Sequence, residues 1–322
     1  MIENQAHGAI LPRLGILMFV QFFIWGAWYL SVSLYMYEHG MGAVRFYAYT
    51  AGPLGAIIAP FFTGLIADRF FNTEKVLGAL FLLAGGFMML LPFVGRLAGT
   101  PIEWSEGAGG VEVVVAEEVT VLGMTMVKGE LFNWVILAHM ICYMPTLGLT
   151  ASLSFHHLPR GSEQFPLVRL WGTIGWIIAG YTLTFLFVSG DLKGEMREAQ
   201  FWLGAIASLA LGVYCFTLPR TPAPKRGQPV NVRDMLFMDA WKQMAKPSFA
   251  VFIIGSFLVC IPLAAYYASL QQQMEAMDMS YIAFWKNTGT WIEAALMFAM
   301  PLFFRKLGIR KMILIGIAAW IA

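Results

Sequence analysis

Eight apolar stretches, each long enough to cross a lipid bilayer, follow one another from residue 14 to the end of the chain. A spanning helix needs about 20 mainly apolar residues, because the hydrocarbon core is about 30 Å thick and a helix rises about 1.5 Å per residue. The composition agrees, since 59% of the residues are hydrophobic and only 12% are charged. The sequence therefore predicts an all-α integral membrane protein. Its predicted spans are residues 14–37, 43–67, 76–94, 131–153, 166–188, 201–218, 249–270 and 281–304, and a ninth begins near Lys311.

The loop charges predict how the chain is oriented. Lys and Arg collect on the cytoplasmic side of membrane proteins, and here they collect after the second, fourth, sixth and eighth spans. The segment between the third and fourth spans is instead rich in glutamate. We therefore expect a multi-pass protein of the bacterial cytoplasmic (inner) membrane with its N-terminus in the cytoplasm.

An internal repeat predicts the architecture. Arg69 and Lys75 follow the second span, and Arg305 and Lys311 follow the eighth span in the same way, 236 positions later. The repeat predicts two halves of six helices that rock about a site near the bilayer midplane. Within the 322 residues the C-terminal bundle is expected to be truncated, so that four further helices would follow in the native protein and the fragment alone would not transport. The expected units are an N-terminal six-helix bundle (1–218), a cytoplasmic linker with an interfacial helix (219–247) and the start of the C-terminal bundle, with helices 7, 8 and part of 9 (248–322).

Two connecting segments have patterns of their own. In the 97–130 segment, Val alternates with Glu or Thr and Gly123 interrupts the alternation, which predicts a small β-hairpin on the outer side. In the linker, Asn231 is placed to cap a short helix with Asp234 in its first turn. The hairpin has no function that its sequence reveals, and a variable surface decoration is the expected role.

Three motifs resemble known families. The stretch from Gly64 to Arg69 resembles the loop motif of the major facilitator superfamily, in which an acid and a base, here Asp68 and Arg69, belong to a gating charge network; the motif's usual Gly is Phe71 here. Residues 143–149 and 165–176 are similar to the bacterial nucleoside:proton symporter family. The resemblance covers nearly the whole chain apart from the 97–130 insertion. It implies the major facilitator fold and inward symport of a nucleoside with a proton.

The resemblance also implies site residues. An Arg and a Thr of helix 5 and a Glu of helix 8 contribute to the central cavity in that family, and Arg169, Thr173 and Glu293 stand at the matching positions. The amide-bearing positions of the family differ, because Ala264, Tyr267 and Thr290 occupy them here. Proton coupling is thus expected to carry over, whereas base preference is expected to change.

Residue spacing leads to a similar cavity. Glu293 lies roughly 20 Å in from the outer end of its span, where a carboxylate costs about 2.5 to 3.5 kcal/mol, so it must face water, pair or hold a proton. That makes Glu293 the candidate proton site, against the alternative of a structural Glu bonded to a neighbouring helix. Arg169, Thr173 and Trp176 share one helical face, as do Gln21, Trp25 and Trp28. The alternatives are an interfacial Arg and an aromatic packing stripe.

The fourth span presents His139, Tyr143 and Thr146 on one face. His139 is a second candidate for proton transfer, because imidazole titrates near neutral pH, although a core histidine bonded to a neighbouring helix is the alternative. Tyr267 and Gln271 of the seventh span extend the polar lining. The full set of candidate substrate contacts is Gln21, Trp25, Trp28, Tyr143, Thr146, Arg169, Thr173, Trp176, Tyr267, Gln271, Thr290 and Glu293.

The expected partners are a nucleoside-like solute, a proton and the lipid bilayer, with no nucleic acid, no cofactor and a monomeric state. Three cysteines lie in three different spans without metal-ligand spacing, so no metal site is expected. No GxSxG, HExxH or Walker pattern is present, which argues against a membrane enzyme. A sugar or other small polar metabolite is the alternative solute. A sensor that keeps a transporter fold is the alternative function.

Overall fold

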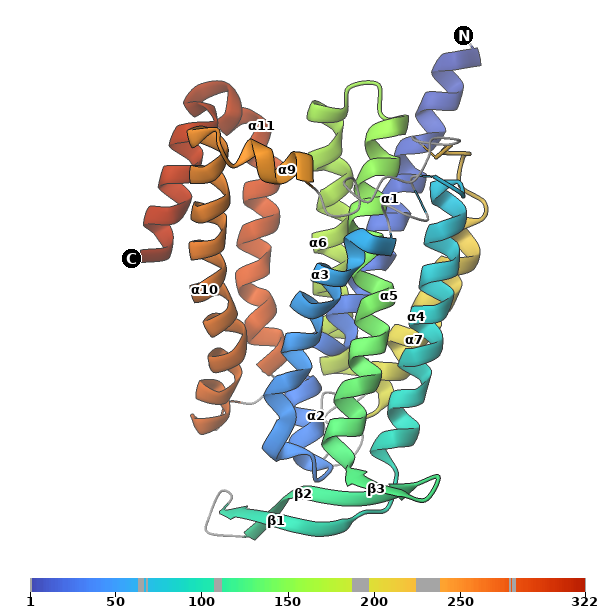
Figure 1. Cartoon of the computed structure of the whole chain (residues 1–322). Helices are drawn as coiled ribbons and strands as arrows, with labels where there is room; N and C mark the ends of the chain where they lie inside the picture. Colours follow the sequence, from blue (N-terminus) through green and yellow to red (C-terminus); the bar gives the residue numbers. More distant parts are fainter. Residues whose placement is uncertain are drawn as a thin grey trace.

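The structure is a computed structural model, and it describes residues 2–62, 67, 69–106, 112–186, 197–223, 238–277, 279 and 282–321. A helical segment lies over each of the eight predicted spans (Figure 1). The helical elements are α1 (Ile2–Tyr29), α2 (Val32–Glu38), the 3-10 helix η1 (Gly42–Thr50), α3 (Ala51–Phe62), α4 (Thr73–Gly95), α5 (Lys128–His157), α6 (Gly161–Leu186), α7 (Ala199–Cys215), α9 (Met238–Gln243), α10 (Pro247–Ala276) and α11 (Ile282–Ile321).

The first two predicted spans are not uniform helices. The first breaks at Leu30 and Ser31, where Ser31 Oγ donates to Gln200 Oε1 at 3.2 Å, and the second starts as the 3-10 helix η1. Within the described residues, only Ile10–Glu38, Thr73–Gly95 and Lys128–His157 are both long and apolar enough to cross a membrane. The span 43–67 falls short because it is divided between η1 and the 12-residue α3.

The helices pack as one bundle with two helices beside it. α1 contacts α6 and α7, while α4 lies between α5 and α7, and α11 contacts α6 (Figure 1). α1 and α6 approach closely because glycines stand at their crossing: a side chain on Gly26 would meet the backbone of Trp176, and one on Gly175 would meet that of Phe19. The two predicted helices at the C-terminal end form one element, α11, with non-helical backbone at Gly308.

The predicted hairpin is present and belongs to a larger sheet. β1 (Thr100–Glu106), β2 (Glu112–Val121) and β3 (Met124–Val127) form an antiparallel sheet in the order β1-β2-β3. The sequence did not predict β1. Lys128 Nζ contacts Glu117 Oε2 at 2.9 Å and ties the sheet to the start of α5.

Two ends of the bundle are distinct in Figure 1. The N-terminus and α9 lie at one end, and the sheet lies at the other. α9 is the described part of the predicted linker helix, whose proposed cap Asn231 and first-turn Asp234 lie outside the described residues. The linker begins tied to the bundle, because the backbone N–H of Thr73 donates to Thr221 O at 3.0 Å.

Candidate functional site

Arg169 lies at the contact between α6 and α1. Its guanidinium carbon is 3.8 Å from the centre of the Phe22 ring of α1, a cation-π arrangement. Its Nη1 points to Thr173 Oγ1, one turn further along α6, at 3.4 Å. That distance exceeds the usual 2.7 to 3.2 Å of an N–H···O bond. Arg169 is therefore held mainly by the aromatic face, and most of its five donors have no protein acceptor among the described residues.

α11 packs against α6 next to Arg169 and contributes residues to the same region. Thr173 is buried and its Oγ1 donates to Met297 Sδ at 3.4 Å, and Glu293 lies close enough for its charge to act on Arg169. Trp291 Nε1 donates to Tyr181 Oη at 2.7 Å and joins α11 to α6 further along the same contact. The structure thus brings Arg169, Thr173 and Glu293 together, and the carboxylate of Glu293 remains exposed.

A group of aromatic rings continues from Arg169 along α1. Trp25 meets Trp176 edge to face with ring centres 5.5 Å apart, and it meets Tyr29 at the same separation. Tyr29 in turn packs against Tyr49 of η1 at 5.1 Å. The sequence analysis missed Tyr29 and Tyr49. The signal for Tyr29 was present, because it follows Trp25 by four residues and so shares its helical face.

Three of the predicted polar residues bond to one another rather than facing open space. Gln21 Nε2 donates to Thr146 Oγ1 at 2.9 Å, and Tyr143 Oη donates to the backbone oxygen of Gln21 at 2.6 Å. All three side chains are fully buried. They tie α1 to α5 behind the Arg169 region, and only Gln21 Oε1 lacks a partner among the described residues.

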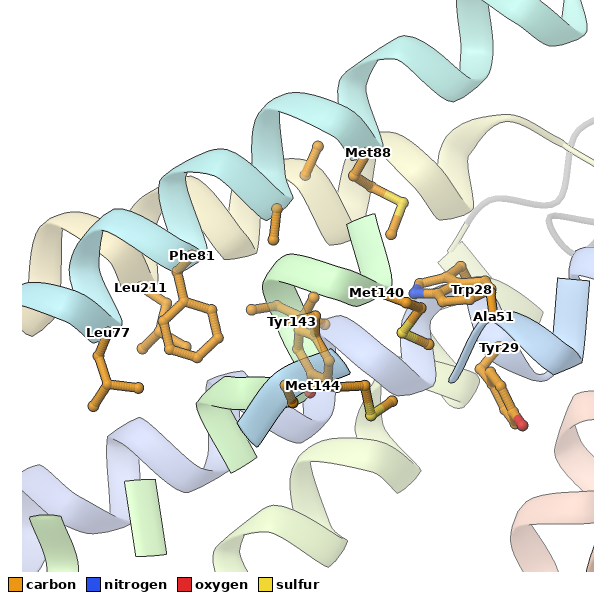
Figure 2. Close-up of a cluster of buried hydrophobic side chains, with 14 of the residues drawn as sticks. Trp28, Tyr29, Ala51, Leu77, Phe81, Met88, Met140, Tyr143, Met144 and Leu211 are labelled. Carbon is orange, nitrogen blue, oxygen red and sulfur yellow. The ribbon is translucent and has the colours of Figure 1, made fainter. Parts of the chain in front are cut away.

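His139 and Trp28 are also part of the packed interior, where Figure 2 shows Trp28 near Met140. The rings of Trp28 and His139 meet edge to face with their centres 5.8 Å apart, and both side chains are almost completely buried. His139 Nδ1 lies 2.9 Å from Ala84 O. A carbonyl only accepts, so Nδ1 carries the proton and Nε2 is a bare acceptor. Neither this nitrogen nor Trp28 Nε1 has a hydrogen-bond partner among the described residues.

The predicted charge motif is only partly visible. Asp68 lies outside the described residues, and Arg69 is buried. A neighbouring network was missed: the buried carboxylate of Glu74 accepts from the Thr221 backbone N–H at 2.9 Å, and His157 Nε2 lies 2.9 Å from Thr221 Oγ1. A Glu in the first turn of a helix was the available signal.

The side chains of Tyr267 and Gln271 are outside the described part of the chain, and Thr290 is half-buried on α11. A cavity of about 600 Å³ opens between α1 and α6, but it is apolar and none of the predicted binding residues lines it. The cavity is lined by Leu11, Pro12, Gly15, Ile16, Phe19, Leu167, Val168 and Trp171.

Among the described residues, no group of His, Cys, Asp or Glu side chains is arranged to hold a metal ion.

Comparison with known sequences identifies relatives over nearly the whole chain. The family described as nucleoside H+ symporter matches residues 9–98 and 109–322, which leaves out the whole of β1. The candidate nucleoside transporter YegT of Escherichia coli K12 is 32% identical over 95% of this chain, and xanthosine permease of the same strain is 24% identical over 97%. The chain spans 64% of the length of YegT and 69% of that of the permease. These relatives are transporters rather than enzymes.

Two solved structures have the same fold. The nucleoside transporter NupG superposes with a TM-score of 0.69 at 23% identity, over 97% of this chain and 71% of that one. The xylose transporter XylE from E. coli superposes with a TM-score of 0.61 at 14% identity, over 93% of this chain and 74% of that one. These superpositions show that the chain shares its fold with both structures.

Proposed function

We propose, because the chain belongs to the nucleoside H+ symporter family, that it carries a nucleoside with a proton across the bacterial inner membrane by alternating access. Family membership is the observation that carries the proposal. Two observations support it: Thr173 of α6 contacts Met297 of α11, and the charge of Glu293 on α11 acts on Arg169 of α6. A transporter of this plan binds its solute between two halves, and these residues come from both.

We assign solute binding to the donors and rings around Arg169. The guanidinium fork suits hydroxyl or carbonyl oxygens of a nucleoside, because its donors are held in a fixed plane. Trp25 and Trp176 are half-buried and offer ring faces for stacking. Gln21, Trp28, Tyr143 and Thr146 are buried behind this region, so in this proposal they touch the solute only in another state of the transport cycle. Tyr267, Gln271 and Thr290 complete the proposed contacts.

We assign proton coupling to Glu293. The negative charge of Glu293 acts on the Arg169 guanidinium across the α6–α11 contact. Proton binding removes that charge, so in this proposal it changes the attraction between α6 and α11 when the solute binds. The protonated Glu293 side chain also costs less free energy in an apolar environment than its carboxylate does. His139 is the second proposed proton site, and Asp68 with Arg69 forms the proposed gating pair.

The proposed assembly is a monomer with a cytoplasmic N-terminus, with 1–218 as the first helical unit, 219–247 as the linker and 248–322 in the second unit. The position of α9 at the end opposite the sheet supports a linker on the side of the N-terminus (Figure 1).

A second solute class follows from one observation. The amide-bearing positions expected to recognise a base edge hold Ala264, Tyr267 and Thr290. A hydroxyl and a phenol suit a polyhydroxyl ring at least as well as a base. A sugar or another small polar metabolite is therefore the second candidate solute.

Uptake by the native protein in proteoliposomes tests the proposal. Radiolabelled uridine, adenosine and several sugars are compared with and without an imposed pH gradient, and empty liposomes serve as the control. Gradient-dependent accumulation of a nucleoside supports the first candidate. Accumulation of sugars alone supports the second, and uptake that ignores the gradient contradicts proton coupling.

A further inference from the structure

The two ends of the β-sheet differ in charge. Glutamates stand at positions 103, 106 and 112, towards the end of the β1–β2 pair that lies away from the β2–β3 turn, and at positions 117 and 118 in the second half of β2. The following residues, 119–127, contain no charged side chain and are mainly Val, Leu and Met. They form the end of β2, the turn and β3. The turn and the residues next to it are therefore uncharged and mainly apolar, whereas the far end of the β1–β2 pair is acidic.

Leu122 at the tip of this hairpin is unusual in two ways. Its side chain is 93% exposed, and its backbone φ is +52°. Together with Gly123 at φ +80°, it forms the two-residue turn between Val121 and Met124. Such turns favour Asn, Asp or Gly, which tolerate positive φ far better than Leu. Neither turn geometry nor packing within the described residues accounts for a Leu here, and Met124 beside it is also 59% exposed.

The rest of the sheet is held firmly, so the tip has a defined position. Val115, Ala116 and Val119 of β2 are buried, and Lys128 pairs with Glu117. Next to the turn, Thr120 Oγ1 and Thr125 Oγ1 lie 3.2 Å apart across the two strands. Figure 1 shows the turn at the side of the bundle, near the lower end of α4. α4 is one of the helices that are long and apolar enough to cross a membrane, so its end is expected near the level of the bilayer surface.

We propose that Leu122 and Met124 insert into the lipid leaflet at the sheet end of the bundle. The neighbouring helix α4 is apolar and long enough to cross a bilayer, so the proposed contact continues the surface that α4 would present to lipid. Apolar side chains gain free energy when they leave water for the acyl boundary. Residues 119–127 add no charge that would have to be desolvated there, Glu117 is paired with Lys128, and Glu103, Glu106 and Glu112 lie towards the far end of the β1–β2 pair, away from anionic headgroups. The hairpin thus anchors the sheet, and with it the ends of α4 and α5, to the membrane.

Spin labelling measures the depth of the tip. In a chain with Cys142, Cys215 and Cys260 replaced by Ala, a nitroxide is attached at Leu122→Cys or, as the control, at the exposed Ser105→Cys of β1. Both proteins are placed in vesicles of phosphatidylcholine and phosphatidylglycerol. The ratio of oxygen collisions to nickel-complex collisions is expected to be at least about threefold higher at position 122, because oxygen concentrates in the acyl region. Equal ratios at the two positions would overturn the proposal.

A second variant separates lipid contact from contact with another copy. With the label at Met124→Cys, Leu122→Asn introduces a residue that tolerates positive φ and removes the apolar side chain. The oxygen preference at 124 is expected to fall by about half or more. An unchanged preference would exclude Leu122 as the anchor. Dipolar broadening that disappears on dilution with unlabelled protein would place the tip against a second copy and overturn the proposal as well.

Discussion

The interface between α4 and α7 and the interface between α1 and α5 solve helix packing in opposite ways. Gly78 and Gly212 face each other across α4 and α7: a Cβ on Gly78 would lie 3.0 Å from Gly212 O, and one on Gly212 would lie 3.1 Å from Gly78 O. Ser208 Oγ donates to Phe81 O at 2.8 Å, so the polar group within this contact is satisfied. Small residues bring the backbones close, which is how helices associate in lipid.

Between α1 and α5, polar atoms are buried without a complete set of partners. Among the described residues, Gln21 Oε1, Trp28 Nε1, His139 Nε2 and Thr150 Oγ1 have no hydrogen bond. Each buried unpaired polar group costs about 1 to 3 kcal/mol. The α4–α7 contact is thus closed by small residues and a satisfied hydrogen bond, whereas the α1–α5 contact retains buried hydrogen-bonding atoms at the expense of stability.

The largest expected effect is on coupling. Glu293→Gln keeps the shape of the side chain but cannot titrate, so accumulation driven by a pH gradient should be lost while exchange of labelled solute survives. Proteoliposome uptake with and without a gradient measures both activities. Glu118→Gln on the exposed sheet is the matched control and should accumulate normally. A Glu293→Gln protein that still concentrates solute would move the proton site elsewhere.

Arg169→Ala should follow in size. Loss of a charged donor to the solute is worth about 1.5 to 3 kcal/mol, or roughly 10- to 100-fold in Kd. Arg169→Lys keeps the charge but not the planar fork, so an intermediate loss is expected. Calorimetric titration with nucleosides gives the affinities, and thermal unfolding in detergent should show little change. If the unfolding temperature drops and the affinity for nucleosides does not, Arg169 stabilises the fold rather than binding the solute. The contrast drawn between the two interfaces would then be wrong.

The α4–α7 contact should respond in the opposite way. Gly78→Leu forces the side chain against Phe216 and the backbone of Gly212, and overpacking of this kind costs about 1 to 3 kcal/mol. At Gly86, on the same helix, an added Cβ would meet no atom within 4 Å, so Gly86→Leu should leave stability unchanged or slightly higher. Thermal unfolding of both variants in one detergent tests the pair. Similar melting temperatures would show that α4 and α7 are not closely packed.

The smallest expected effect comes from His39, which lies just outside the first span. His39 belongs to neither interface, so its effect on stability is a reference for the variants above. Its ring stacks on Tyr35 with centres 4.0 Å apart, and burial lowers its pKa below 6.5. The unfolded chain then binds more protons than the folded one, so stability should fall as pH drops below about 6.5. Melting curves from about pH 7.5 to about pH 5.5 should show this decline, and His39→Gln should reduce it. An identical pH slope in both proteins would contradict the prediction.

Much of the fold follows from local patterns, and the exceptions have identifiable causes. Apolar length located the helices, and Gly123 with its alternating neighbours located the β2–β3 hairpin. The break at Leu30 and Ser31 was missed because neither Gly nor Pro marks it; a long-range bond from Ser31 to Gln200 accompanies it. β1 was missed because its pairing with β2 depends on residues beyond its own sequence.

The sequence by itself determined which helical faces carry chemistry, because a period of 3.6 residues places Arg169, Thr173 and Trp176 on one side whatever surrounds them. Only the tertiary structure decided which polar side chains remain available. Gln21 and Tyr143 are 122 positions apart, yet they bond to each other and are buried, while Arg169 keeps most of its donors. That outcome depends on how α1 crosses α5 and α6, and the crossing is set by close contacts such as Gly26 with Trp176, which no local pattern specifies.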